Sequence, residues 1–120
     1  MTEKTPTTQD LLNNITEGIF KKKGNDVVSL NLSKLENSIC DYFIICHAES
    51  TTQVAAIAAS VEDMVEENLH ISAWHKDGYK NAIWILLDFG EVVVHVFQRE
   101  AREFYNLEDL WADGYRTVLV

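Results

Sequence analysis

The chain of 120 residues contains 47% hydrophobic and 24% charged residues and carries a formal net charge of −9. A chain of this size and composition can bury one hydrophobic core, so we expect a single domain over residues 1–120. Its apolar runs are far shorter than the roughly 20 residues that cross a bilayer, and we expect no membrane partner. The acidic excess disfavours direct binding to DNA or RNA phosphates and favours a basic protein as partner.

Two local features bear on the cellular compartment. The first ten residues have the pattern of neither a secretory signal nor a transit peptide, which predicts a cytoplasmic location. Cys40 and Cys46 are separated by five residues and match neither the spacing of a redox motif nor that of a zinc site. We therefore expect two reduced, packed cysteines and neither a metal nor another cofactor.

The first half of the chain predicts two helices and two strands. Apolar residues at helical spacing indicate a helix over residues 8–23, which Gly24 would end. Residues 27–32 alternate like a half-buried strand, a polar connector follows over residues 33–39, and residues 42–46 predict a second strand. Ser50 and Gln53 fit a capping box at the start of a long helix, whose apolar face reaches Leu69.

The second half is rich in β pattern. Residues 71–74 predict an edge strand, residues 75–81 a loop, and residues 82–87 and 92–97 two strong strands whose short connection implies an antiparallel hairpin. Two short helical segments are expected at residues 100–105 and 107–111, and residues 113–120 form an apolar tail that could pack, pair or stay loose. The long helix acts as a crossover, so the fold class is α/β (α+β), with flanking helices on a mixed sheet.

The hairpin has two chemically different faces. A two-residue turn pairs Asp88 with Glu91 and Trp84 with His95, whereas a three-residue turn with Gly90 in a bulge shifts the pairing by one. With the first register, one face is purely aliphatic. The other face mixes aromatic, aliphatic and titratable groups, as interface cores do: Trp84, Leu86, Val93, His95 and Phe97.

Aromatic residues are concentrated between Trp84 and Trp111. This stretch holds 6 of the 12 aromatic residues within 28 of the 120 positions. Composition alone fits an ordinary core as well as a binding surface, because small domains fill their interior with their aromatic residues.

Three blocks together resemble the ribosomal silencing factor family, also called Iojap-like proteins. They are residues 41–46, residues 84–97 and residues 104–111. The middle block has the order Trp, Leu-Leu-Asp, Phe-Gly, Val-His-Val-Phe, and the last block reads Phe-Tyr-x-Leu-Glu-x-Leu-Trp. The resemblance covers nearly the whole chain from the first helix onward. It departs from the family at residues 77–83, where the family often has a longer, glycine-containing loop.

The resemblance implies a nucleotidyltransferase-like core without catalytic motifs and a translation repressor that is not an enzyme. Its implied partner is the fourteenth protein of the large ribosomal subunit, and occupying that protein would sterically block subunit joining under nutrient limitation. The matching positions give the expected partner-binding residues, of which Trp84 is the first choice and Trp111 the one best suited to the core: Trp84, Leu86, His95, Phe97, Tyr105, Leu107 and Trp111.

Two other classes of function compete with this one. A nucleotide-binding or nucleotidyltransferase-like enzyme would need metal-binding carboxylates two positions apart after a Gly-Ser turn, a combination that this sequence lacks. Neighbouring strand residues Cys46 and His47 point to opposite faces and cannot pair as nucleophile and base. A homodimeric adaptor could pair an exposed edge strand, at residues 71–74 or at residues 118–120.

Overall fold

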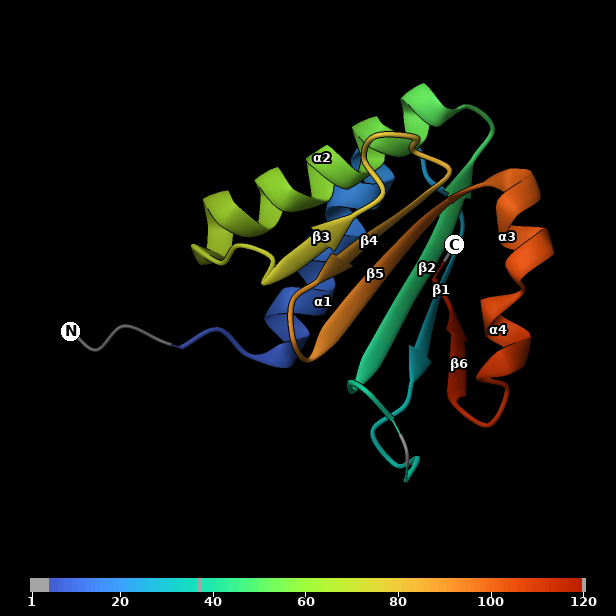
Figure 1. The fold of residues 1–120 in the computed structure, drawn as a ribbon. Coiled ribbons are helices and arrows are strands. Elements are labelled where there is room, and N and C mark those ends of the chain that lie inside the picture. Colours follow the sequence, from blue (N-terminus) through green and yellow to red (C-terminus); the bar gives the residue numbers. More distant parts are fainter. Residues whose placement is uncertain (1–4, 37, 120) are drawn as a thin grey trace.

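A computed structural model describes residues 5–36 and 38–119 of the chain, and these residues form one six-stranded sheet with helices (Figure 1). Along the sheet the strands follow the order β3-β4-β5-β2-β1-β6. The elements in chain order are α1 (Thr8–Lys21), β1 (Asn25–Asn31), β2 (Tyr42–Ala48), α2 (Thr51–Leu69), β3 (His75–Asp77), β4 (Trp84–Asp88), β5 (Val92–Gln98), α3 (Arg99–Tyr105), α4 (Leu107–Leu110) and β6 (Tyr115–Val118).

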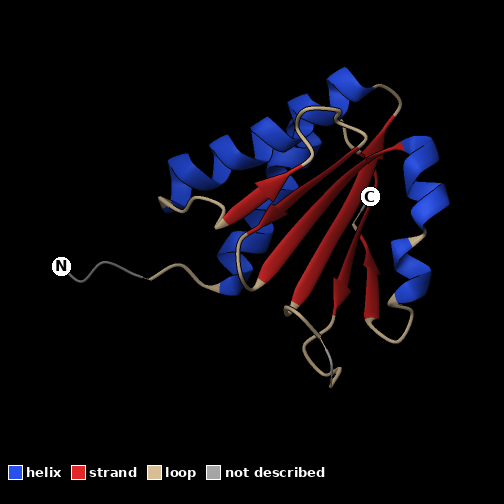
Figure 2. Cartoon of the chain, viewed as in Figure 1, coloured by secondary structure: helices blue, strands red, loops and turns tan. Residues whose placement is uncertain are grey.

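The sheet is mixed, which confirms the predicted α+β class. Among the strands of the described residues only β2 and β5 run parallel, and α2 lies on the connection between them, as expected for a crossover. The other four strand pairs are antiparallel. Figure 2 shows α1 and α2 together on one face of the sheet, whereas α3 and α4 lie on the other side of it.

Each face of the sheet contributes to its own hydrophobic core. Ile15 of α1 and Ile57 of α2 pack with the aliphatic face of β4 and β5, which includes Ile85 and Val94. The second core lies on the opposite face and contains the larger rings, among them Phe43 and Phe97, with Ala101 of α3. The division of the hairpin into an aliphatic and an aromatic face is therefore confirmed.

The first helix begins at a complete capping box. The Thr7 hydroxyl accepts a hydrogen bond from the Asp10 N–H, and the Asp10 carboxylate accepts one from the Thr7 N–H. The helix ends at Lys21, two residues earlier than expected. The residue in the left-handed conformation is Lys23, with φ of 60°, and not Gly24. A Cβ on Gly24 would lie 2.4 Å from the Ile19 side chain, so packing rather than backbone conformation requires this glycine.

The long helix α2 also begins where the sequence predicts. The Ser50 hydroxyl accepts a hydrogen bond from the Gln53 N–H over 3.2 Å, which gives half of the predicted capping box. The Gln53 amide instead donates to the carbonyls of Lys22 and Lys23, and it thereby joins the start of α2 to the end of α1.

The hairpin register differs from the predicted one by two residues. Trp84 lies opposite Phe97 and Asp88 opposite Val93, so the turn consists of Gly90 and its successor Glu91. Gly90 has φ of 90°. The predicted turn would place Phe89 at the first turn position, where both favoured hairpin turns require positive φ, and a bulky residue is strained there. A shift of two leaves both faces unchanged because side chains alternate with a period of two.

One edge of the sheet differs from the predicted one, and the other edge decides between the predicted alternatives for the tail. Residues 71–74 form no strand, and the edge strand is the three-residue β3, which lies within the predicted loop. At the other edge, β6 pairs with β1, and Leu119 N–H donates to the Val27 carbonyl. Up to Leu119 the tail is therefore paired and not loose, while Val120 lies outside the described residues.

Both cysteines are buried and free, as expected. Burial raises the pKa of the Cys40 thiol to about 11 and that of Cys46 to about 12. Within residues 5–36 and 38–119, no helix has the length and apolar character needed to span a bilayer.

Candidate protein-binding face

Side chains from β3 and β4 form an open part of the aromatic sheet face. The register places Asp77 opposite Leu86 and His75 opposite Asp88, while Trp84 lies opposite Phe97 on the neighbouring strand. Residues in such pairs point to the same side of a sheet. We call this surface the open sheet face and define it as His75, Asp77, Trp84, Leu86 and Asp88.

The open sheet face combines exposed charge with half-buried apolar surface. His75 and Asp77 are exposed, whereas Trp84, Leu86 and Asp88 are half-buried. α3 follows β5 directly and packs on β5 and β2, so the cover it provides lies next to β4 and not over β3 (Figure 1). Two carboxylates therefore stand beside an aromatic ring and a leucine, a composition that suits a partner with a basic and partly apolar surface.

Trp84 is the centre of an aromatic cluster. Its ring centroid lies 4.9 Å from that of Phe97 and 4.8 Å from that of Tyr105 on α3. Its indole Nε1–H donates to Nδ1 of His95 over 3.1 Å. These contacts fix the rotamer of Trp84 and join the hairpin to α3.

His95 lies beneath this cluster and is held neutral. Burial lowers the pKa of His95 to about 3, because a charged imidazolium would lose its hydration. Since Nδ1 accepts the indole hydrogen, the ring proton belongs on Nε2, which is buried and has no hydrogen-bond partner among the described residues. Phe43 lies edge-on to the imidazole at a centroid distance of 4.5 Å.

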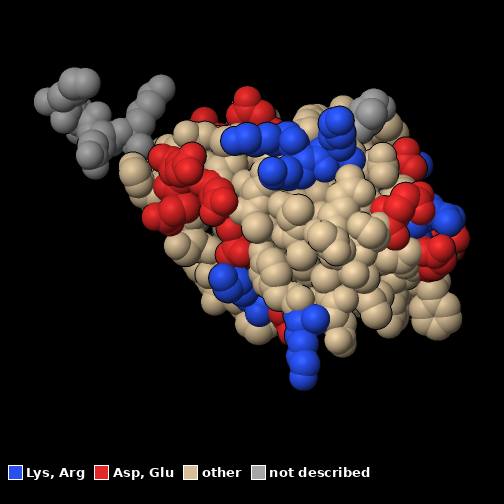
Figure 3. Space-filling model, turned by 90° about the horizontal axis from the view of Figure 1, so that it is seen from above, with Lys and Arg blue, Asp and Glu red and all other residues tan. Residues whose placement is uncertain are grey.

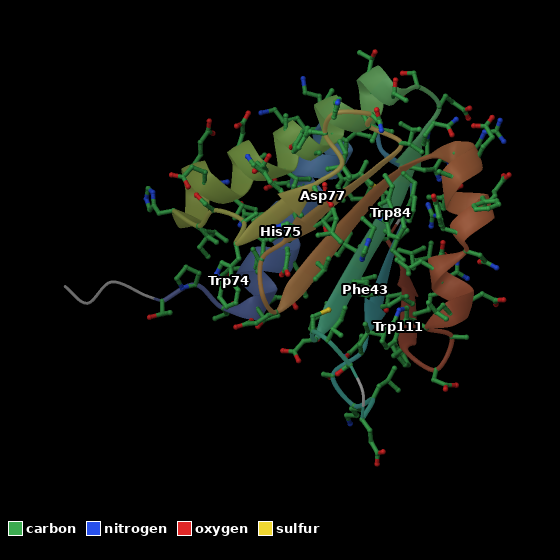
Figure 4. The ribbon with its side chains drawn as sticks, in the orientation of Figure 1. Phe43, Trp74, His75, Asp77, Trp84 and Trp111 are labelled. Carbon is green, nitrogen blue, oxygen red and sulfur yellow. The ribbon has the colours of Figure 1, made fainter. Side chains whose placement is uncertain are left out.

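Trp74 lies at the hairpin tip, just before the edge strand β3. Its side chain is 82% exposed, although its backbone N–H is fixed by a hydrogen bond to the Asp88 carbonyl over 2.8 Å. Its ring lies against Gly90, where an added Cβ would be only 3.4 Å away. The ring lines a shallow hollow of about 320 Å³ together with Cys40, Asp41, Phe89, Gly90 and Glu91. Figure 4 shows the labelled residues spread across the sheet from Trp74 to Trp111.

The seven residues expected from the sequence lie at three depths. Trp84 and Leu86 belong to the open sheet face. Half-exposed Tyr105 of α3 contacts Trp84 at the border of this face. Half-buried Leu107 and Trp111 pack against the second core, where the Trp111 ring lies 5.6 Å from that of Phe43 on β2. Phe97 is wholly buried and His95 is 3% exposed, so in this conformation they can support the surface but cannot touch a partner.

Sequence reasoning missed Trp74, His75 and Asp77. They lie in or beside β3, which is too short to show an alternating pattern and was predicted to be a loop. The available signal was the tryptophan itself, because a large aromatic residue within a polar stretch is a common interface feature.

The chemical groups considered for an enzyme are dispersed. Cys46 packs in the core beneath α1 and α2, whereas His47 lies on the other side of the sheet, where its Nδ1 is 2.9 Å from Arg102. Burial and the Arg102 charge lower the pKa of His47. The Asp88 carboxylate accepts a hydrogen bond from the Gly90 N–H at the hairpin tip. In the part of the chain that the structure describes, no three metal-ligating side chains converge on one point.

Comparisons with known proteins agree on one family. The family model described as "Ribosomal silencing factor during starvation" matches residues 5–119. The protein "Ribosomal silencing factor RsfS" of Halalkalibacterium halodurans is 42% identical over 106 residues, which are 88% of this chain and 89% of that protein. The RsfS of Bacillus subtilis is 42% identical over 93 residues, covering 78% of this chain and 77% of the relative.

A solved structure shows the same fold. The X-ray structure of a protein from Chromobacterium violaceum superposes with a TM-score of 0.84 at 31% identity and covers 95% of this chain and 93% of that one. The match extends over the sheet and the helices on both of its faces.

Proposed function

Because this chain belongs to the ribosomal silencing factor family, we propose that it represses translation by binding the fourteenth protein of the large ribosomal subunit. While it is bound there, this chain sterically prevents the small subunit from joining when nutrients are scarce. This role needs no catalysis, and it places the protein in the cytoplasm with the ribosomes.

The open sheet face is the observation that supports this proposal best. Asp77 and Asp88 offer negative charge beside Trp84, while Trp74 offers a large exposed ring at the sheet edge. Ribosomal proteins are basic because they bind RNA, so complementary charge speeds encounter and apolar contact supplies affinity. The overall charge of −9 acts in the same direction.

Rigid positioning suits a steric inhibitor. The Trp84 ring is held by Phe97, Tyr105 and the hydrogen bond to His95, so little conformational entropy is lost when a partner binds. Inhibition then depends only on the volume that the bound domain occupies.

Sedimentation with purified large subunits tests the proposal directly. We expect the chain to co-sediment with large subunits, to bind the isolated fourteenth protein, and to reduce the formation of joined ribosomes from separated subunits. Failure of the wild-type chain to bind either target would refute the proposal.

Two substitutions locate the surface. Asp77→Lys and Trp74→Ala change exposed side chains, and we expect each to weaken binding by at least about tenfold, as for interface residues of high contribution. Val118→Ala is the matched control, because Val118 is also exposed on an edge strand but lies at the opposite end of the sheet. Equal loss in all three variants would remove the open sheet face from the site.

A homodimer is a second proposal about partners. β3 and β6 are the two outer strands of the sheet, and each pairs with one neighbouring strand. The molecular mass in solution, measured at several concentrations, tests it. A mass that stays at that of one chain would exclude the dimer.

A further inference from the structure

Three consecutive lysines lie where α1 ends. Lys21, Lys22 and Lys23 are all exposed, and we call them the lysine cluster. Among the described residues, no carboxylate forms an ion pair with any of them. By contrast, Lys76 and all three arginines are paired: Lys76 with Glu62, Arg99 with Glu49, Arg102 with Glu108 and Arg116 with Glu108. The lysine cluster is thus a rare concentration of uncompensated positive charge on an acidic protein.

The backbone of the lysine cluster is fixed in place. The N–H groups of Lys22 and Lys23 donate to the carbonyls of Ile19 and Phe20, and the carbonyls of both lysines accept from the Gln53 side chain. Lys23 also adopts φ of 60°, which turns the chain sharply at the helix end. Three ammonium groups therefore project from one rigid turn.

The surface beside the lysine cluster is shaped by small side chains. Lys21 and Lys22 border a hollow of about 400 Å³ whose floor includes Ala56, Ala59 and the buried Ser60. Asp63, Met64 and Glu67 of α2 line the rest, and those two carboxylates would repel an anion. An anionic chain would therefore lie along the lysine side. Figure 3 shows a band of Lys and Arg side chains on this view of the molecule, with acidic side chains in separate groups.

The overall charge does not cancel this local field. At physiological ionic strength charges are screened beyond about 8 Å, so a phosphate in contact responds mainly to the nearest ammonium groups. Lysines also stabilise a helix C-terminus, but this effect is confined to the last turn. Lys22 is the C-cap of α1, so this effect includes it and fades toward Lys23, and it leaves all three ammonium groups without a carboxylate partner among the described residues.

We propose that the lysine cluster contacts phosphates of ribosomal RNA when the protein is bound to the large subunit. This inference rests on the proposed function, which brings the chain next to RNA. The open sheet face would supply the protein contact, and the lysine cluster would add a contact that reads charge and not base sequence.

The salt dependence of binding to large subunits tests the inference. We compare wild type with Lys22→Gln/Lys23→Gln and with a control, Lys34→Gln/Lys80→Gln, which removes two other exposed lysines. Both variants change the net charge by the same amount, from −9 to −11 (−9 − 2). We expect the cluster variant to bind more weakly and to lower the slope of log K against log salt by about two, whereas the control leaves the slope unchanged. Thermal unfolding confirms that all three chains are folded.

Three results separate this inference from the proposed function. If wild type and cluster variant bind large subunits with equal affinity and slope, the RNA contact is refuted and the proposed function stands. If wild type binds no large subunits, the proposed function fails first, and the inference falls with it. If the lysines instead mediate binding to vesicles with anionic headgroups and leave ribosome binding unaffected, the lysine cluster serves a lipid surface and the inference is overturned.

Discussion

The indole Nε1–H of Trp84 donates to Nδ1 of His95 over 3.1 Å, and this bond connects the open sheet face to the buried aromatic core. The Nε2 of His95 has no partner among the described residues, so the bond from Trp84 is the one hydrogen bond that the imidazole makes in that part of the chain. The bond therefore makes the surface residue Trp84 important for stability as well as for binding.

Trp84→Phe removes this donor and keeps an aromatic ring in the cluster. Both nitrogens of His95 would then be buried without a partner, so we expect the free energy of unfolding to fall by about 1–3 kcal/mol. Urea denaturation measures the change. Trp74→Phe is the control, because its exposed ring donates no hydrogen bond to any described residue, and we expect a change within about 0.5 kcal/mol. Equal stability of the two variants would show that the bond contributes nothing.

The lowered pKa of His95 predicts a pH dependence with a definite sign. The folded chain holds this histidine neutral down to about pH 3, whereas the unfolded chain protonates it near 6.5. Stability is therefore complete above pH 6.5 and decreases as the pH falls toward 3, because the unfolded chain binds the extra proton. This one group contributes a slope of at most about 1.4 kcal/mol per pH unit.

His95→Asn isolates that contribution. The asparagine oxygen can accept the Trp84 hydrogen in the place of Nδ1, but the amide does not titrate. We expect the stability of this variant to depend less steeply on pH between 6.5 and 4 than that of wild type, measured by urea denaturation at each pH. Parallel profiles would mean that the pKa of His95 is the same in the folded and the unfolded chain, so that burial does not hold the imidazole neutral.

Much of this fold follows from local sequence patterns. The apolar periodicity of α2 and the alternation in β4 reflect packing mainly on one face, whereas the apolar run of β5 reflects burial on both faces. Each segment carries its pattern by itself. The same alternation identified Trp84 and Leu86 on the open sheet face. The observed register also has a local signal, since Gly90 is the residue of the loop that takes positive φ most easily.

The remaining features depend on contacts between distant segments. β6 exists because β1 offers it a partner, and its four residues show no pattern of burial. Burial of His95 and Phe97 likewise depends on α3 and α4 folding back over the sheet. For this reason alternation could assign the two side chains to a face but not to a depth.

Glu108 joins three elements and gives a third prediction. Its carboxylate lies 2.9 Å from Nε of Arg102 and 3.5 Å from Nη2 of Arg116, and the Arg102 side chain is only 10% exposed. Glu108→Gln would leave the Arg102 guanidinium without its nearest counter-charge, so we expect a loss of about 1–3 kcal/mol and faster hydrogen exchange in β6. Glu103→Gln is the control, because its partner Arg99 is exposed and such pairs contribute little. Unchanged exchange in β6 would show that Glu108 does not hold that strand.

Gly18 sets the distance between α1 and α2. The sign of the change in stability on Gly18→Ala tests how closely the two helices must approach. A Cβ at Gly18 would lie 2.8 Å from the Val61 Cα and 3.1 Å from the Ser60 carbonyl, both of which belong to the backbone of α2. The Ser60 hydroxyl also donates to the Gly18 carbonyl over 2.8 Å. Helix propensity alone predicts that Gly18→Ala stabilises α1 by about 1 kcal/mol. Overpacking against a backbone that cannot yield locally predicts a loss of about 1–3 kcal/mol, and we expect this loss to dominate.

Denaturation of Gly18→Ala beside Glu17→Ala, an exposed neighbour on the same helix, distinguishes the two effects. A more stable Gly18→Ala variant would mean that the two helices can separate at little cost, and the close crossing would then not determine how they pack on the sheet.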